Sequence, residues 1–358
     1  MKILIVGLGY AGTRFLRAFD RSGAACALGG IETAYVDRVR KPMPNRYFPN
    51  VAAALASFRP DIVAVCVNDD AHAEILGQLA GFQGFVICEK PLTGTAHPLG
   101  PTIAALADVS GFCLDLIERY SEVTAELKAF VRHRHLRLLR AHFHWAKNRI
   151  NDRRPTCGVT SEVIHPIDLV QHICDPALPL RLQSVFGSRS DFSISGSDVL
   201  DSVALSAELG AAVVTGFSSF VALSRRREIE LTFTDPDGSL IYAVMIFDTP
   251  VWDRDHLRIW RQTAAGEEMI VDLHTQFEPD DPGLATIRKL VRLVDDVVHH
   301  ARGGPASPDT MPGLDTACSL QILLNEISSV ARTPPTVRYV QGDSRVFASD
   351  EADLERLG

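Results

Sequence analysis

Short apolar runs alternate with segments of helical periodicity along the first part of the chain. The apolar runs are Ile3–Val6, Thr33–Val36, Ile62–Val67, Phe85–Cys88 and Phe112–Leu116. The helical patterns between them are Gly12–Arg21, Val51–Ser57, Ala71–Leu79 and Pro101–Ala107. Strands that are buried on both faces of a sheet read as continuous apolar runs, and helices between them allow parallel crossovers. The pattern therefore predicts a parallel sheet with helices on both faces.

From about Ser121 the pattern changes. A helix (Val123–Arg132), a strand (Leu138–Trp145) and a second helix (Ile164–Ile173) are expected first. Four alternating strands follow directly after one another: Ser202–Leu209, Ala212–Phe220, Glu228–Thr234 and Ser239–Ile246. Strands without helices between them predict an antiparallel sheet, and two helices, Leu284–Ala301 and Pro312–Ala331, close the chain. We thus expect an α/β domain over residues 1–118, an α+β domain with a large, mainly antiparallel sheet over 119–340, and a tail over 341–358.

Composition narrows the possible partners. A length of 358 residues suffices for two domains, and a net charge of −8 argues against a general nucleic-acid binder. No stretch of about 18 apolar residues occurs, so no membrane span is expected. The seven cysteines are dispersed and include no C-x-x-C pair, which favours reduced thiols in a cytoplasmic protein.

A glycine-rich segment follows the first predicted strand and opens the first predicted helix. It reads Gly7-Leu8-Gly9-Tyr10-Ala11-Gly12. In this position the first glycine allows a tight turn, the second lets the backbone approach a pyrophosphate, and the third permits close helix–strand packing. The helix N-terminus adds amide donors for the phosphates. The segment predicts a Rossmann domain that binds NAD or NADP through these residues, and the alternative is a glycine-rich turn without a ligand.

The end of the second predicted strand bears on the choice between NAD and NADP. Asp37 stands where a carboxylate pairs with the ribose hydroxyls of NAD. Arg38, Arg40 and Lys41 follow, and an arginine there can accept the 2′-phosphate of NADP. The carboxylate would be repelled by that phosphate, so the sequence favours NAD, with NADP as the alternative.

Four further motifs carry a family resemblance. Cys88-Glu89-Lys90-Pro91-Leu92 ends a strand, Asn68 and His72 follow the preceding one, Glu118-Arg119-Tyr120 lies at the domain crossover, and His165-Pro166-Ile167-Asp168 reads H-x-x-D. Together with the glycine motif, the chain resembles the glucose–fructose oxidoreductase/inositol dehydrogenase (Gfo/Idh/MocA) family. The usual Thr-Pro before the histidine of the second motif is missing here, where the chain reads Val67-Asn68-Asp69-Asp70-Ala71-His72.

The resemblance implies an activity and roles for its residues. It implies hydride transfer with sugars, cyclitols or related polyols, and homodimers or homotetramers formed through the open face of the second sheet. Lys90 would be the catalytic or substrate-orienting amine and His165 the general acid/base. Asn68, His72 and Glu89 would lie at the cofactor, as would Lys90. A lysine at the carboxyl end of a parallel strand fits this chemistry because cofactors bind at that edge.

One departure from the family affects the proton relay. Many members carry Asp four residues before this histidine, and here that position is Ser161, followed by Glu162. A serine cannot act as a carboxylate base. The substrate proton would therefore be transferred by Glu162, by Tyr120, or by His165 without a partner. Asp168 is expected to orient His165 or to satisfy a backbone group.

Other polar groups admit more than one interpretation. His165, Asp168 and His172 share a helix face and form a possible metal set, but we expect no metal. Because a proline is favoured in the first turn, we expect the regular helix to begin near Pro166. The histidines at 142 and 144 face one side of a strand. The basic run 147–154 is either an anion grip or a solvated loop, and Arg225-Arg226-Arg227 is interpreted as a charged hairpin end.

The sequence therefore predicts an NAD(P)-dependent oxidoreductase that acts on a hydroxyl or ketone of a sugar, nucleotide sugar or cyclitol. Two alternatives remain. One is a reductase of a C=N or tetrapyrrole-type substrate within the same family, which the missing aspartate would tolerate. The other is an NAD(P)-binding regulator that kept the fold and lost the chemistry.

Overall fold

The computed structural model describes residues 1–27, 30–150, 152, 154–196, 198–275, 282–304 and 309–339. The chain forms two compact units. The first comprises Met1–Tyr120 with Asp280–Ile322, and the second comprises Ser121–Pro279 with Leu323–Gly358. The tail expected over residues 341–358 lies outside the described residues.

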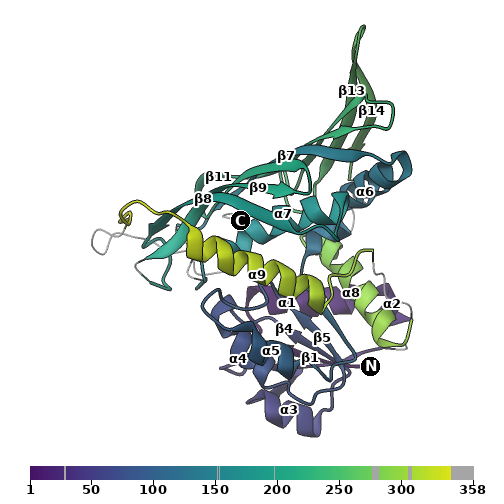
Figure 1. The fold of residues 1–358 in the computed structure, drawn as a ribbon. Helices are drawn as coiled ribbons and strands as arrows, with labels where there is room; N and C mark the ends of the chain where they lie inside the picture. The colour runs from purple at the N-terminus through teal and green to yellow at the C-terminus, as the bar shows by residue number, and fades with distance from the viewer. Residues whose placement is uncertain are drawn as a thin grey trace. The chain divides into compact units, whose positions relative to one another are not determined.

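The first unit is built on a six-stranded parallel sheet with the order β3-β2-β1-β4-β5-β6 (Figure 1). Its strands are β1 (Lys2–Val6), β2 (Glu32–Val36), β3 (Arg46–Phe48), β4 (Ile62–Val65), β5 (Phe85–Cys88) and β6 (Gly111–Leu114). Its helices are α1 (Tyr10–Arg21), α2 (Gly23–Cys26), α3 (Val51–Ser57), α4 (His72–Gly77), α5 (Leu99–Ala105) and α8 (Arg288–Ala301), with 3-10 turns at Asp69–Ala71, Ile117–Tyr120 and Pro282–Leu284. The predicted parallel α/β domain is confirmed.

Helix α8 returns to the first unit from far along the sequence. Its buried side chains recur at helical spacing and share one core with Phe15 and Phe19 of α1; they are Leu290, Leu293, Val294, Val297 and Val298. Lys289 of α8 is ion-paired with Glu118, and both side chains are buried. The sequence analysis placed this helix in the domain over 119–340. In the structure residues 280–322 group with the first unit, because α8 buries its apolar stripe there.

The second unit contains an eight-stranded sheet with the order β14-β13-β12-β11-β7-β10-β9-β8. Its strands are β7 (Arg137–Asn148), β8 (Leu180–Ser190), β9 (Val199–Leu209), β10 (Ala212–Ser219), β11 (Val221–Thr234), β12 (Leu240–Ile246), β13 (His256–Thr263) and β14 (Gly266–His274). All neighbours are antiparallel except β10 and β7, which are parallel. The mainly antiparallel sheet is thus confirmed, while β8, β13 and β14 were not predicted.

Helices cover one face of this sheet. Helix α6 (Glu122–Arg134) packs against α7 (Thr160–Cys174), and α7 packs against β7 and β10 (Figure 1). Helix α9 (Leu314–Val330) begins in the first unit and ends in the second. Among the described residues, no helix combines the length and apolar character that crossing a membrane requires.

The start of α7 corrects a prediction. The helix was expected to begin near Pro166, but it begins at Thr160 and contains the proline. Its first turn closes on Gly158, whose carbonyl accepts hydrogen bonds from the Ser161 amide (3.1 Å) and the Ser161 hydroxyl (3.0 Å). Gly158 has φ +109°, which favours glycine, and a Cβ there would lie 2.7 Å from the Leu200 carbonyl oxygen. The helix is buried almost throughout, and this packing offsets the cost of the internal proline.

Candidate active site

The three motif glycines have separate structural roles. Gly7 has φ +90°, donates to the Val36 carbonyl (2.8 Å), and has no room for a Cβ, which would lie 2.8 Å from the Val67 amide nitrogen. A Cβ at Gly12 would lie 2.0 Å from the Gly7 carbonyl oxygen, so close packing requires glycine there as well. At Gly9, in contrast, a Cβ would meet nothing within 4 Å. This open backbone precedes α1, which begins without a side-chain cap, as expected where a pyrophosphate is bound.

Because Gly9 has open space and Gly12 has none, substitutions at these two glycines can test cofactor binding and folding separately. A valine at Gly9 fits the folded chain, since the backbone there is extended (φ −88°), but it fills the space that the pyrophosphate needs. We expect Gly9→Val to weaken NADH binding by at least about tenfold, or about 1.4 kcal/mol, at unchanged thermal stability. Gly12→Ala should instead destabilise the protein by about 1–3 kcal/mol or more through overpacking. Fluorescence titration with NADH and thermal unfolding of both variants measure the two effects. If Gly9→Val bound NADH with wild-type affinity, the assignment of the glycine segment Gly7–Gly12 as the pyrophosphate cradle would be refuted.

The carboxylate after β2 points back to the glycine segment. The Leu8 amide donates to Asp37 Oδ2 at 3.1 Å, and Lys41 Nζ lies 3.8 Å from the same oxygen. Arg38 is exposed on the loop that follows. Asp37 therefore stands at the carboxyl edge of the sheet beside the cradle, where a ribose-binding carboxylate is required.

His72 joins the ends of two neighbouring strands. It is 1% exposed, and its Nδ1 lies 2.6 Å from the Pro91 carbonyl oxygen while its Nε2 lies 3.1 Å from that of Val67. The ring thus connects the segment after β4 to the segment that carries Lys90. Asn68 forms the N-cap of the 3-10 turn Asp69–Ala71 in the same segment. The geometry indicates that His72 positions the Lys90 loop.

Asp115 is a buried acid beside the Glu89-Lys90-Pro91 segment, and it was not among the site residues expected from the sequence. Asp115 follows β6, its amide donates to the Cys88 carbonyl at 2.8 Å, and the residue is 4% exposed. Burial raises the pKa of Asp115 well above its usual range, and the Glu89 carboxylate raises it further. The strand run Phe112–Leu116 contains this single acid at the carboxyl end of a parallel strand. An acid that interrupts an apolar run at this edge of the sheet is the sequence signal from which Asp115 could have been predicted as a site residue.

Tyr120 belongs to the core of the first unit. Its hydroxyl donates to the Asp296 carboxylate on α8 at 2.9 Å, and the ring packs in the hydrophobic cluster. Burial raises the pKa of the Tyr120 phenol well above its usual range, and Asp296 adds to this effect. The phenol therefore stays protonated at neutral pH and is poorly suited to act as a base.

In the second unit, α7 carries the residues of the H-x-x-D motif. The His165 ring stacks on Trp145 of β7, with centroids 5.8 Å apart and planes inclined by 25°. Asp168 is 2% exposed and lies one helical turn further along. His172 lies 3.4 Å from Lys128 Nζ of α6. An ammonium group beside this imidazole disfavours a cation, so the arrangement does not favour a metal set of His165, Asp168 and His172.

Glu162 belongs to a buried network of charges. Its Oε2 lies 2.7 Å from Lys147 Nζ and its Oε1 accepts from Arg227 Nη2 at 3.0 Å. Arg227 also pairs with Asp248. The Glu162 carboxylate thus neutralises the buried Arg227 and the partly buried Lys147, which points to a structural role rather than to proton transfer.

Arg227 corrects the interpretation of the three consecutive arginines as a hairpin end. They lie within β11, and Arg227 is 3% exposed, with its guanidinium 4.8 Å from the Trp252 ring centroid. Its neighbour Arg226 pairs with Glu228 on the outer face, where its side chain is 54% exposed. Alternation along the strand turns one arginine into the unit and the next outward.

The basic run 147–154 is largely neutralised by the protein itself; residues 151 and 153 lie outside the described part of the chain. Asp152 is ion-paired with Arg149 (2.9 Å) and Arg154 (2.5 Å). Burial acts to raise the pKa of Asp152, but the hydrogen bonds and charges of these two arginines outweigh it and lower the pKa to about 2. The two arginines therefore form ion pairs with Asp152 within the protein, which does not favour their use as a binding site for an external anion.

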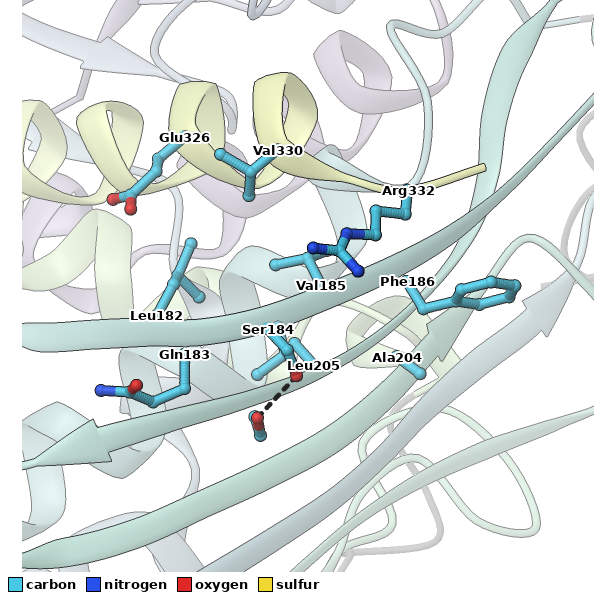
Figure 2. Close-up of a pocket in the computed structure, with 11 residues that line it drawn as sticks. Leu182, Gln183, Ser184, Val185, Phe186, Ala204, Leu205, Glu326, Val330 and Arg332 are labelled. Atoms are coloured by element: carbon cyan, nitrogen blue, oxygen red, sulfur yellow. Dashed lines mark hydrogen bonds between the residues drawn. The ribbon is translucent and has the colours of Figure 1, made fainter. Parts of the chain in front are cut away.

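A groove of about 610 Å³ lies on the second unit between strands β8 and β9 and the end of α9. Figure 2 shows Glu326, Val330 and Arg332 facing the strand residues, which include Leu182 and Phe186. None of the site residues predicted from sequence lines it. We therefore do not assign the substrate to this groove.

Comparison with known families and structures adds to this geometry. Residues 1–108 match the sequence model of the Gfo/Idh/MocA oxidoreductase family with an NAD-binding Rossmann fold. The resemblance that the motifs indicated is thereby confirmed over the N-terminal domain. No curated protein sequence matches the chain.

Solved structures share the fold of most of the chain. A levoglucosan dehydrogenase in complex with NADH and L-sorbose has a TM-score of 0.73 at 15% identity, covering 92% of this chain and 96% of that one. A 3-ketoreductase from Actinomadura kijaniata, in complex with TDP-benzene and NADP, has a TM-score of 0.71 at 11% identity, covering 95% and 99%. A UDP-N-acetylglucosamine 3-dehydrogenase from Acidithiobacillus ferrooxidans has a TM-score of 0.66 at 14% identity, covering 92% and 97%.

Proposed function

We propose that the protein is an NAD(P)-dependent oxidoreductase that interconverts a hydroxyl and a ketone on a sugar, nucleotide sugar or cyclitol. The observation that carries this proposal is the open cradle at Gly9, which shares the carboxyl edge of one parallel sheet with Lys90. The activities of the structural neighbours, two sugar or nucleotide-sugar dehydrogenases and a ketoreductase, support the substrate class.

Each residue has a defined task in this proposal. A nicotinamide cofactor held at the glycine segment would supply the acceptor or donor of the hydride. Lys90 Nζ binds the substrate oxygen and stabilises the charge that develops on it. The His165 imidazole, held against Trp145, takes the hydroxyl proton during oxidation and returns it during reduction. Lys90 belongs to the first unit and His165 to the second, so the proposal requires both to meet the same substrate oxygen.

The cofactor preference follows from Asp37. If this carboxylate accepts hydrogen bonds from the ribose hydroxyls, NADH should bind more tightly than NADPH, whose 2′-phosphate it repels. Asp37→Ala should narrow the difference between the two dissociation constants. Parallel titrations of the wild type and the variant test this. A wild-type preference for NADPH would show that Arg38, Arg40 or Lys41 decides instead.

A substrate screen tests the proposed activity. Purified protein is assayed at the nicotinamide absorbance with NAD+ or NADP+ and polyols, cyclitols and sugars, and with NADH or NADPH and keto-sugars and nucleotide keto-sugars. We expect turnover with at least one member of these classes. Turnover only with imine or tetrapyrrole-type substrates would favour the alternative reductase. Cofactor binding without turnover on any substrate would favour the regulator.

The same proposal includes self-association through the open face of the second sheet, in the cytoplasm. Several apolar side chains are exposed on this unit, among them Phe186 (59% exposed) and Val213 (49%), which a second copy would cover. The seven cysteines are free thiols, which supports a reducing compartment.

A further inference from the structure

Two histidines and an aspartate converge on the hairpin that forms one edge of the large sheet. His256 of β13 lies directly opposite His274 of β14, and Asp272 lies two residues before His274. Because side chains alternate along a strand, all three lie on the same face of the hairpin. The end of the hairpin is fixed by the Thr275 amide, which donates to the Asp255 carbonyl at 3.0 Å.

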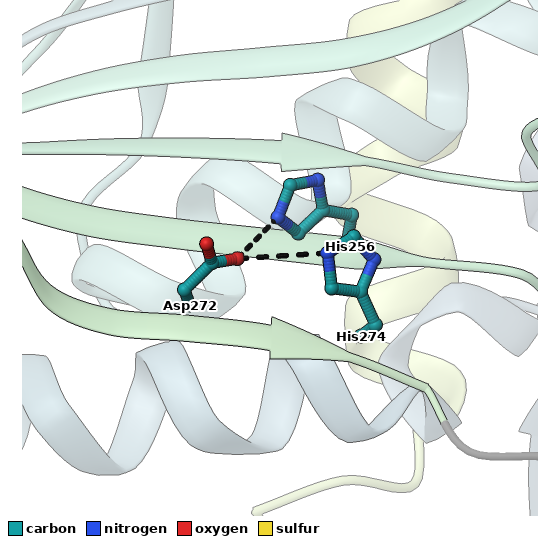
Figure 3. Close-up of side chains that lie close together, drawn as sticks. All are labelled: His256, Asp272 and His274. Carbon is teal, nitrogen blue, oxygen red and sulfur yellow. Dashed lines mark hydrogen bonds and ion pairs between the residues drawn. The ribbon is translucent and has the colours of Figure 1, made fainter.

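The ligand atoms of these side chains already lie close together. His256 Nε2 is 2.7 Å and His274 Nε2 is 3.6 Å from Asp272 Oδ1. Figure 3 shows the two rings side by side, both directed at this carboxylate; their centroids are 3.7 Å apart and their planes differ by 16°. A tetrahedral zinc ion with bonds of about 2.0–2.1 Å separates its ligand atoms by about 3.3 Å. The ligand atoms of the three side chains all lie within 4.8 Å of one another, so rotation of these side chains would bring them around an ion.

One carboxylate and two imidazoles face one another here, and an arginine lies beside them. Arg258 faces Asp272 across the strands and competes with a cation, but its guanidinium is also placed over Trp260, 5.4 Å from the ring centroid.

We propose that His256, Asp272 and His274 bind a zinc ion, or a similar late first-row divalent ion, with one coordination position left for water or another ligand. Two imidazoles and one carboxylate are the donor set that such ions prefer. This site is separate from the helix series of His165, Asp168 and His172, and it does not depend on the proposed oxidoreductase activity. Among the described residues, these three are the group whose histidine, cysteine and acidic ligand atoms lie close enough to share an ion.

Cobalt(II) serves as the spectroscopic probe for this site. The full-length protein is freed of metal, titrated with Co(II) while the visible absorption of tetrahedral Co(II) is followed, and then titrated with Zn(II). We expect one Co(II) per chain, displaced by Zn(II). His274→Ala and Asp272→Asn should each weaken binding by at least about tenfold. His133→Ala, which changes an exposed histidine of α6, should bind as the wild type does.

The outcomes are distinct. Absence of Co(II) binding to the wild type, or binding that persists unchanged in the His256→Ala/His274→Ala double variant, would overturn the proposal. In the second case the metal would bind elsewhere, and the trio would be an ordinary ion pair between a carboxylate and stacked imidazoles. The three tryptophans, Trp145, Trp252 and Trp260, all lie in the second unit, so an unchanged tryptophan fluorescence of the variants would show that any loss of metal binding is not due to misfolding of this unit.

Discussion

Replacing Lys90 by methionine is expected to lower kcat by about 10²–10³-fold, the usual contribution of a group that stabilises a developing oxyanion. Methionine keeps the length and apolar body of the side chain but removes the ammonium that would bind the substrate oxygen. The affinity for NADH should change little, since the pyrophosphate is assigned to the glycine segment around Gly9. Steady-state kinetics with the substrate found in the screen, together with NADH titration, measure both quantities.

Companion variants sharpen this test. Lys90→Arg keeps the positive charge, so it should recover part of kcat if the ammonium stabilises the charge on the substrate oxygen, as proposed. It should recover little if the amine has to release a proton, because arginine stays protonated near neutral pH. His165→Ala should lower kcat by a similar factor, whereas Ser161→Ala should cost far less because that hydroxyl already donates to the Gly158 carbonyl. Near-normal kcat in His165→Ala, combined with its loss in Glu162→Gln, would contradict the assigned roles.

Replacing Arg227 by methionine is expected to destabilise the second unit by about 3–5 kcal/mol. The change removes one ion pair of Glu162 and the ion pair between Arg227 and Asp248, while the side chains of both acids are fully buried. The three tryptophans, Trp145, Trp252 and Trp260, all lie in this unit, so their fluorescence during denaturant unfolding reports on it selectively.

The adjacent arginine provides a matched control. Arg226→Met removes an ion pair with Glu228 in which the arginine side chain is 54% exposed, and such surface pairs contribute about 0–1 kcal/mol. We therefore expect two neighbouring Arg→Met changes to differ by several-fold in their effect on the free energy of unfolding. Equal losses in the two variants would refute the buried network as a source of stability.

The fold of the first unit was predictable because its strands are buried on both faces and appear as uninterrupted apolar runs. The glycine motif and the Lys90 segment were predictable for a related reason, since each follows such a run directly. Helix α8 was recognisable as amphipathic, but the sequence does not say which apolar surface its stripe covers. Its partner, α1, lies more than 250 residues earlier in the chain.

The residues missed or misread depend on contacts between distant segments. In the sequence, Arg227 is one of three consecutive basic residues. Only the folded chain shows that it is ion-paired with Glu162 of α7 and with Asp248, which follows β12. From the sequence, Tyr120 is a candidate base. In the folded chain its hydroxyl donates a hydrogen bond to Asp296 of α8, which does not favour that role. Strands β13 and β14 carry charged residues at many positions and lack the clear alternation that marked β9 and β10, so local pattern did not reveal them.

Direct transfer of deuterium tests the central claim most closely. NADH, or NADPH if that cofactor is preferred, is labelled with deuterium at the transferable C4 position and supplied with a keto-sugar or nucleotide keto-sugar that is turned over. The account predicts that mass spectrometry finds one deuterium on the carbinol carbon of the product and an unlabelled oxidised cofactor. A product without the label, or a labelled cofactor that is bound and recovered unchanged with every substrate, would contradict it.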